Sequence, residues 1–402
     1  MSVIKQIEFL DVGSKSIFID VQPLHARNPQ KMPDVDGYDT VHITPSALQF
    51  RAFTRNSRLN MMLNGGRLAF IRMMHACRDI LSQVNPQAIL LCHDQLFVEA
   101  AFVDAAKQLG IPTIFVQEGP FRIIKDNKPT RFASKMRLHA TRLAESAGIV
   151  PAIAPYGLAD YAGVLCASEH YRKIWVRAGA NGSRVHVVGV PRFDALREAI
   201  EPEPEPDRSA QRRIVLISQP FASDRFVTQR ASDDLLEMLA RGLNKAHALE
   251  PFTFNIRLHP RASEETAQAL TSRLDFPFGF DDNKTAIEKS IARYDCVIGH
   301  YSTALLESII KEKNTIIVPV PKSGFLYEEE ANKQAWFESI GVPVAYDSDE
   351  CARTILDVIR SETRTSFASG LEDECGLVDG KASRRAAVFI QKIVSIPNSP
   401  VK

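Results

Sequence analysis

Residues 88–117, AILLCHDQLFVEAAFVDAAKQLGIPTIFVQ, decide the fold class of this chain. The apolar run 88–92 predicts a buried strand, and the run 113–117 predicts the next one. Between them, residues 96–109 carry apolar side chains at helical spacing, and Gly110 ends that helix. A strand, a helix and a second strand within about thirty residues form a βαβ unit, which requires a parallel sheet.

The same alternation of short apolar runs and helical periodicity recurs along the rest of the chain. In the first half, two further strands are expected at 163–167 and 184–188, around the segment 169–178. In the second half, the expected elements are strands at 213–217, 253–258, 296–298 and 315–319 and helices at 233–246 and 302–311. We therefore expect an α/β protein with two Rossmann-like domains that face each other across a cleft.

One stiff segment divides the chain into halves of similar size. Residues 201–208, EPEPEPDR, alternate proline with glutamate. Each proline removes a backbone donor and holds the preceding residue extended, and the glutamates repel one another. We interpret this segment as a linker between an N-terminal, acceptor-side domain at 1–200 and a C-terminal, nucleotide-binding domain at 209–395, with a loose tail at 396–402.

The composition argues against several classes of protein. The 49 Lys and Arg residues nearly balance the 48 Asp and Glu residues, so a net charge of +1 argues against binding nucleic acid through overall charge. The six cysteines form no CxxC pair, which argues against a disulfide framework or a zinc site. No apolar run approaches the ~18 residues of a membrane-spanning helix, and the N-terminal residues do not read as a secretory signal. We therefore expect a cytoplasmic protein.

Ligands of open parallel sheets bind at the carboxyl ends of the strands, so polar residues just after each strand are the candidates for a site. Glu118 and Arg122 follow the second strand quoted above, with Gly119 between them, where the backbone can approach a ligand closely. Glu118 can act as a general acid or base, or it can simply pair with Arg122 in a turn. His93 follows the first strand and can either touch a substrate or serve the structure.

In the second half, Gln219 and Asp224 follow the expected strand at 213–217. The amide of Gln219 can donate and accept hydrogen bonds at once. Asp224 fits three roles, which are a nucleophile, a base, or the N-cap of the helix that follows.

The next strand end carries His259, Pro260 and Arg261. The proline holds His259 extended, which aims its ring out of the strand end. His259 and Arg261 can bind a phosphate through charge-assisted hydrogen bonds of roughly 1.5–3 kcal/mol each. The alternative is a pair of ordinary loop residues.

Residues 299–307, GHYSTALLE, place small and hydroxyl residues where a helix opens directly after a strand. The free N–H groups and the positive end of the helix dipole favour an anion there. Ser302 and Thr303 add hydroxyls, His300 lies at the strand end, and Glu307 can accept hydrogen bonds from a ribose. The alternative is a plain N-cap at Ser302 with a surface glutamate. Three such strand ends in succession predict one nucleotide site.

The order of these motifs, over residues 88–319, resembles the GT-B superfamily that includes capsule polysaccharide transferases, CDP-glycerol polymerases and UDP-GlcNAc 2-epimerases. The segment 187–194, VVGVPRFD, is similar to the Val-Gly-x-Pro-x-x-Asp element that closes the first domain of these proteins. Residues 118–122, EGPFR, are similar to a Glu-x-Gly-Phe-x-Arg motif of bacterial β-Kdo transferases that build capsules, and related enzymes modify O-antigen chains. Gln219 with Asp224 is similar to their Gln-x-x-x-Asp element.

This resemblance implies a GT-B-like fold and a retaining glycosyltransferase that moves β-Kdo from CMP-β-Kdo to a bacterial surface polysaccharide or glycolipid, such as capsule or lipopolysaccharide. It implies Asp224 as the nucleophile, Glu118 as the acid/base and His93 on the acceptor side. The residues it implies for the nucleotide and donor are Gln219, His259, Arg261, His300, Ser302, Thr303, Glu307 and Arg122. It further implies catalysis without metal or cofactor, and a peripheral association with a membrane export or polymerase complex.

The sequence leaves three alternatives open. An inverting GT-B transferase that uses a UDP-sugar or CDP-glycerol shares the His-Pro and Ser-Thr elements but does not require Asp224. A UDP-GlcNAc 2-epimerase-like isomerase needs no acceptor. A non-catalytic carbohydrate-binding or assembly subunit would keep the fold alone.

Overall fold

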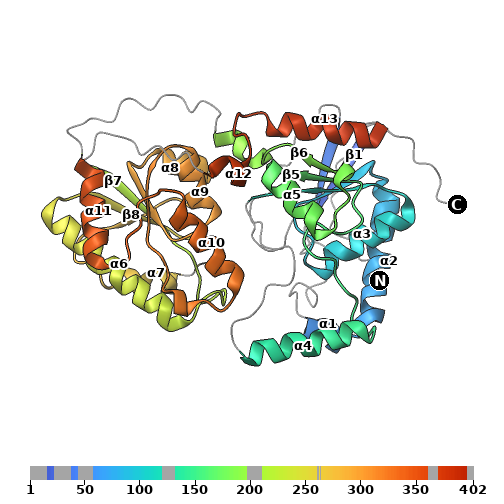
Figure 1. Ribbon diagram of the computed structural model, residues 1–402, viewed down its shortest axis with the longest axis horizontal. Helices are drawn as coiled ribbons and strands as arrows, with labels where there is room; N and C mark the ends of the chain where they lie inside the picture. The colour runs from blue at the N-terminus through green and yellow to red at the C-terminus, as the bar shows by residue number, and fades with distance from the viewer. Residues whose placement is uncertain are drawn as a thin grey trace.

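A computed structural model describes residues 16–21, 38–43, 58–119, 132–196, 211–259, 262, 264–360 and 370–395. The chain forms two α/β domains, each built around a parallel sheet with helices packed against it (Figure 1). The expected linker at 201–208 and the expected tail at 396–402 lie outside the described residues.

The first domain holds a sheet of six parallel strands in the order β2-β1-β3-β4-β5-β6. Its strands are β1 Ser16–Val21, β2 Tyr38–Ile43, β3 Ala88–Leu91, β4 Thr113–Val116, β5 Gly163–Cys166 and β6 Val185–Val187. Its helical segments are α1 Arg58–Leu63, α2 Gly66–Val84, α3 Phe97–Leu109, α4 Phe132–Ser146, α5 Glu169–Ala178, η3 Gly182–Arg184 and η4 Pro191–Leu196. Every residue of β3, β4 and β5 is buried, because helices cover both faces of a parallel sheet.

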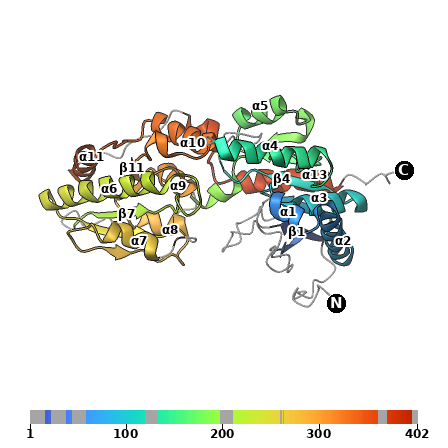
Figure 2. The same ribbon diagram turned by 90° about the horizontal axis from the view of Figure 1, so that it is seen from below.

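The second domain holds a sheet of five parallel strands in the order β11-β10-β7-β8-β9. Its strands are β7 Arg213–Ile217, β8 Thr253–Arg257, β9 Gly279–Phe280, β10 Cys296–Gly299 and β11 Asn314–Ile317. Its helical segments are α6 Gln229–Leu249, α7 Glu264–Thr271, α8 Ile287–Ala292, α9 Thr303–Ile310, η5 Lys322–Gly324, α10 Glu328–Ser339 and α11 Ser348–Arg360. Figure 2 shows the two domains side by side along the long axis of the molecule.

The last two helices, α12 Leu371–Cys375 and α13 Ala382–Ser395, pack on the first domain although they follow the second in the chain (Figure 1). Ala386 and Ile390 of α13 are buried in one cluster with residues of β3, β4 and β5. Tyr171 on α5 donates a 2.5 Å hydrogen bond to Glu374 on α12. The span 209–395 expected for the second domain therefore includes two helices that complete the first.

The predicted α/β class with two Rossmann-like domains is confirmed. The helix expected at 233–246 extends further in both directions, as α6. It begins earlier because Thr228 is its N-cap and accepts a hydrogen bond from the main-chain N–H of Ala231. Asp224 therefore does not cap this helix. Within the described part of the chain, no helix combines the length and the apolar character needed to cross a bilayer.

Candidate functional site

The strand order of each sheet indicates at which strand ends a ligand would bind. In the second sheet β7 lies between β8 and β10 and pairs with both. The chain builds the sheet first on the β8 side of β7 and then on its β10 side. Ligands of such sheets bind at this switch point, outside the carboxyl ends of the strands. Gln219 follows β7 by two residues, and His300 follows β10 directly. In the first sheet β1 has the same position between β2 and β3, and His93 lies two residues after β3.

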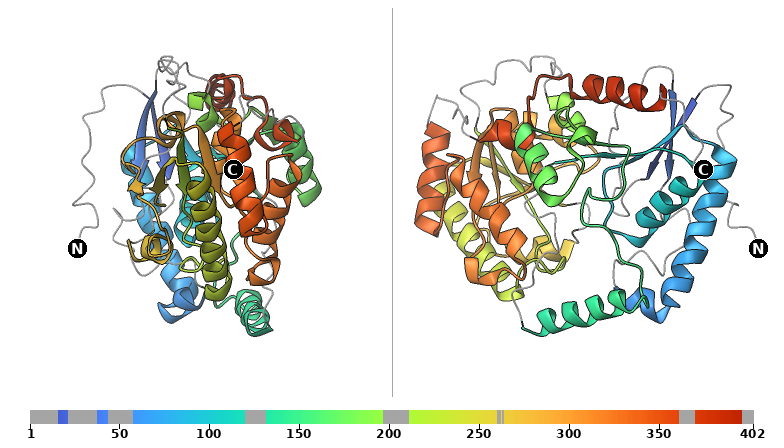
Figure 3. Two further views of the ribbon diagram at one scale, coloured as in Figure 1. Left: turned by 90° about the vertical axis from the view of Figure 1, so that its left-hand side faces the viewer. Right: turned by 45° about the vertical axis from the view of Figure 1, so that its right-hand side comes forward.

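Arg192 joins the strand ends of the two domains. It lies on η4, the last described segment before the second sheet, and its Nη2 donates to the Oε1 of Glu307 on α9 of the second domain. Its Nη1 lies 3.5 Å from the Oε1 of Glu118, which follows β4. A Cβ built on Gly119 would lie 3.7 Å from the Cγ2 of Thr303, so the loop after β4 and the first turn of α9 are in contact range. The right-hand view of Figure 3 shows the two domains next to each other.

The charges in this cluster are unevenly buried. The side chain of Glu307 is 3% exposed, whereas that of Arg192 is 26% exposed. Burial raises the pKa of Glu307, and the positive charge of Arg192 opposes that rise. Burial alone would lower the pKa of Arg192, but the carboxylates of Glu307 and Glu118 outweigh it and raise that pKa. The Oε2 of Glu307 is buried and has no hydrogen-bond partner among the described residues.

A second charged pair lies at the end of β3. The Nδ1 of His93 is 3.0 Å from Oε2 and 3.2 Å from Oε1 of Glu99, a fully buried residue on α3. The N–H of Leu96 also donates to Glu99, which fixes this carboxylate. Burial favours the neutral imidazole, but the hydrogen bond and the charge of Glu99, together with the charges of Asp94 and Glu118, raise the pKa of His93. This carboxylate–histidine pair can hold and move a proton.

Asp94, the next residue, has a structural role. It is buried and accepts hydrogen bonds from the N–H of Gly157 at 2.8 Å and from the hydroxyl of Tyr161 at 3.0 Å. Its carboxylate therefore ties the loop after β3 to the segment before β5. This anchoring keeps His93 in place at the strand end.

The second domain contributes His300 and Ser302. The Nδ1–H of His300 donates to the carbonyl of Val318 at 2.8 Å, and burial lowers the pKa of His300 to about 4. The ring is therefore neutral at pH 7, and it lies 5.4 Å from the ring of Phe221. The hydroxyl of Ser302 accepts from the N–H of Leu305 and is the N-cap of α9, which was the structural alternative for this residue. Gln219 and His300 line one small cavity of this domain.

Asp224 and His259 are half-buried residues in loops beyond the strand ends. Asp224 lies in the turn between β7 and α6, where its N–H donates to the carbonyl of Pro220 at 2.9 Å. The carbonyl of His259 accepts from the N–H of Ala262 at 2.8 Å. Arg122 and Arg261, both expected at the donor site, lie outside the described residues.

Sequence reasoning did not single out Arg192 or Glu99. Arg192 lies inside the quoted segment VVGVPRFD, where the motif pattern leaves its position unspecified. Glu99 lies six residues after His93, and only the turn between β3 and α3 brings the two side chains together. The sequence offered one signal for Glu99, which is an acidic residue inside the apolar stretch LFVEAAFV, because an acidic residue is rarely buried without a partner.

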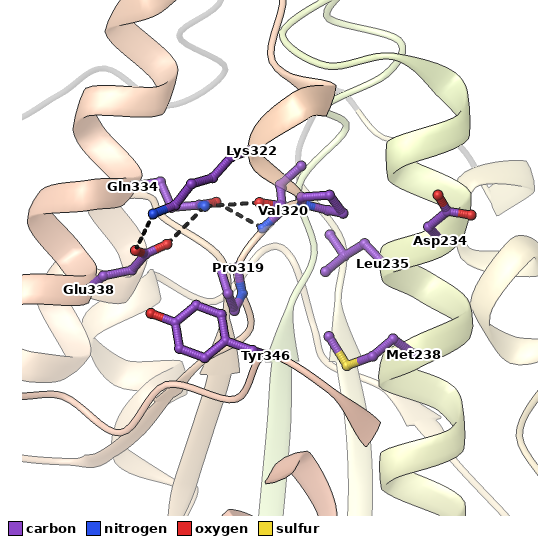
Figure 4. A pocket seen from close by; sticks show the side chains of 10 residues that line it. Asp234, Leu235, Met238, Pro319, Val320, Lys322, Gln334, Glu338 and Tyr346 are labelled. Carbon is purple, nitrogen blue, oxygen red and sulfur yellow. Dashed lines mark hydrogen bonds and ion pairs between the residues drawn. The ribbon is translucent and has the colours of Figure 1, made fainter. Parts of the chain in front are cut away.

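A separate cavity of about 300 Å³ lies in the second domain between α6, α10 and the end of β11 (Figure 4). Leu235, Met238, Pro319 and Tyr346 form much of its wall. There the side-chain Oε1 of Gln334 accepts from the N–H of Val320 at 2.8 Å, and its Nε2 donates to the carbonyl of Val320 at 2.9 Å. This cavity shares no lining residue with the cluster around Arg192.

No protein-family model and no curated protein sequence matches the chain. The folds of several solved structures are nevertheless similar. UDP-GlcNAc 2-epimerase from Neisseria meningitidis, bound to UDP-GlcNAc, is 12% identical with a TM-score of 0.54, and the match covers 94% of this chain and 100% of that one. S. aureus MnaA with UDP is 11% identical with a TM-score of 0.57, covering 96% and 99%. The wall teichoic acid polymerase TagF is 12% identical with a TM-score of 0.50, covering 94% and 89%. These similarities establish a GT-B-like fold for the chain.

Proposed function

We propose that this protein acts on a nucleotide-activated sugar, with the nucleotide at the ends of β7 and β10 and the sugar against the first domain. The observation that carries this proposal is the meeting of Glu118 and Glu307, one from each domain, at the guanidinium of Arg192. Glu118 also lies beside Gly119, which approaches Thr303 in the first turn of α9, so a carboxylate that can act as acid or base stands close to a helix N-terminus that favours a phosphate. Similar folds are known with UDP-GlcNAc and with UDP bound.

The first candidate reaction is epimerisation at C2 of a UDP-N-acetylhexosamine. It is supported by the similarity to UDP-GlcNAc 2-epimerase from Neisseria meningitidis and by the high coverage of both chains. Epimerisation requires a base that removes the C2 proton as the C1–O bond to UDP breaks, and an acid that returns a proton to the opposite face of C2 as UDP adds back to C1. Glu118 and His93 follow the paired neighbouring strands β4 and β3, and they are the proton-transfer groups that we assign to the first domain.

The second candidate is glycosyl transfer, which the His93–Glu99 pair favours. A histidine whose Nδ1 is held by a buried carboxylate presents its Nε2 as a base for the hydroxyl of an acceptor. The β-Kdo version of this reaction uses CMP-β-Kdo, Asp224 as nucleophile, and a surface polysaccharide or glycolipid as acceptor. It rests on the sequence motifs, as do metal independence and a peripheral membrane complex.

One experiment separates the two reactions. The purified protein is incubated in D2O with UDP-GlcNAc and no acceptor, and the sugar is followed by proton NMR. We expect a second UDP-N-acetylhexosamine with deuterium at C2, and its loss in the Glu118→Gln variant. The exposed Glu169→Gln variant on α5 is the matched control and should keep full turnover.

The same protein is also incubated with CMP-β-Kdo and a bacterial surface glycan, with and without EDTA. Release of CMP that depends on the glycan, with no change in UDP-GlcNAc, would overturn the epimerase candidate and favour the transferase. Turnover that EDTA does not reduce would agree with the predicted metal independence.

A further inference from the structure

Arg192 is a cation at the boundary of the two domains, and most of its surroundings are acidic. Its two terminal nitrogens face Glu307 and Glu118, and the charge of Glu288 acts on it as well. Lys311 at the end of α9 donates to the carbonyl of Leu196 at 3.3 Å, which holds η4 against α9. These contacts therefore hold the guanidinium between the two domains.

We propose that Arg192 is the residue that binds the phosphate groups of the nucleotide, exchanging its pairing with Glu307 for a pairing with phosphate. This inference rests on the proposed function and adds a residue that the sequence motifs did not assign. Arginine suits the exchange because its planar fork of five N–H donors matches phosphate oxygens as well as carboxylates.

The negative charges at the strand ends favour such a cation. A nucleoside diphosphate would bring further negative charge to Glu118 and Glu307, and the hydroxyl of Ser302 already caps α9. Arg257, the cation at the end of β8, is held by Asp281 at 2.5 Å and by the carbonyl of Thr285. Of the two guanidiniums, Arg192 is the more exposed, at 26% against 11%.

Glu307 explains why the exchange is reversible. Its Oε1 accepts from Arg192, but its buried Oε2 has no hydrogen-bond partner among the described residues. A buried carboxylate oxygen without a donor carries a desolvation cost. Hydroxyl groups of a ligand can donate to both oxygens once the guanidinium turns to the phosphate, so binding of the ligand offsets the lost ion pair.

The test is isothermal titration of the full chain with UDP and with uridine, for the wild type and three variants, and of the wild type with CMP and with CDP. In Arg192→Gln we expect UDP affinity to fall roughly ten- to a hundredfold, as for a lost charge-assisted contact, with uridine affinity unchanged. Arg192→Lys keeps the charge and should lose less. Lys311→Met removes a contact of the same interface and should bind UDP like the wild type.

Three results would overturn the inference, and they are distinguishable. Equal UDP affinity in Arg192→Gln and the wild type would reject a phosphate contact while leaving the proposed function intact. A parallel loss of UDP and uridine affinity, shared by Lys311→Met, would show that Arg192 only holds the domains together. Wild-type protein that binds neither UDP nor CMP nor CDP would overturn this inference and the proposed function together.

Discussion

The Nδ1 of His93 lies 3.0 Å from the Oε2 of Glu99, and the Glu99 side chain has no exposed surface. The His93 side chain is 36% exposed, so the pair connects a buried carboxylate to the protein surface at the end of β3. A carboxylate in that position fixes the tautomer of the ring, because Nδ1–H donates to it and Nε2 is left as the acceptor. Glu99 is thus a positioning residue for His93.

Replacing Glu99 with glutamine tests this relationship. Glutamine can still accept from Nδ1 but removes the negative charge, so we expect the pKa of His93 to fall from its raised value. If neutral His93 is the base, activity rises as pH increases through that pKa, and the variant moves this limb to lower pH. We also expect turnover to fall by about tenfold or more. NMR titration of the imidazole and a pH–rate profile measure both effects.

An unchanged imidazole titration in Glu99→Gln would contradict the pairing. An unchanged pH–rate profile despite a shifted titration would show that His93 takes no part in proton transfer. The Glu169→Gln variant, with its exposed ion pair to Arg172, is the control for a general loss of charge.

His300 should make the fold sensitive to acid. Its pKa is lowered by burial to about 4, from 6.5. Its contribution is therefore fully present above pH 6.5 and is lost as pH falls toward 4, because the unfolded chain binds the proton first. The loss amounts to about 3 kcal/mol across that window. Urea unfolding from pH 4 to 7 should show a shallower dependence for His300→Gln than for the wild type.

The control variant is His139→Gln, which removes an imidazole that the fold leaves exposed. Equal slopes in wild type and His300→Gln would mean that His300 is not buried as a neutral ring.

Gly376, between α12 and α13, should tolerate no side chain. It has φ = +67°, and a Cβ built there would lie 1.9 Å from the carbonyl oxygen of Ala167. We expect Gly376→Ala to lower the free energy of unfolding by more than about 3 kcal/mol, because backbone must move as well. Gly110, the C-cap of α3, has a similar φ of +70° with open space around it. Gly110→Ala should cost only about 1–2 kcal/mol.

Chemical denaturation of the two glycine variants measures this difference. Similar losses in both would mean that only the left-handed conformation matters and that α12 does not pack tightly against the end of β5.

Asp224 distinguishes the retaining transferase from the other reactions. The epimerase and the inverting transferase need no nucleophile at this position, so Asp224→Asn should retain turnover within about threefold. A retaining mechanism with a covalent intermediate predicts a loss of about a thousandfold or more. Steady-state turnover with UDP-GlcNAc and with CMP-β-Kdo, followed by mass spectrometry for a covalent adduct, decides between them.

Local sequence predicted the central elements of both domains well. The strand expected at 213–217 is β7 with the same bounds, and the helix expected at 96–109 is α3, one residue shorter. Continuous apolar runs identify strands buried on both faces, and Gly110 in the left-handed conformation ends α3. The strand-end rule also placed Glu118 and Glu307, which the structure brings to the same guanidinium.

The partners of these elements could not be predicted in the same way. The sequence of α13 shows that one face is apolar, but an apolar stripe does not specify which sheet it covers. Its packing on β3, β4 and β5 depends on the path of the whole chain. The strands β1 and β2 were not expected at all.

By itself the sequence determined the α/β class, the succession of the central strands along the chain and the chemical groups that follow them, because these depend on short-range periodicity and composition. Only the tertiary structure decided which of those groups meet. Arg192 and Glu307 are 115 residues apart, and Glu99 reaches His93 only through the turn into α3. The physical reason is that charge pairing depends on distance in space and on burial, neither of which is encoded at a fixed spacing along the chain.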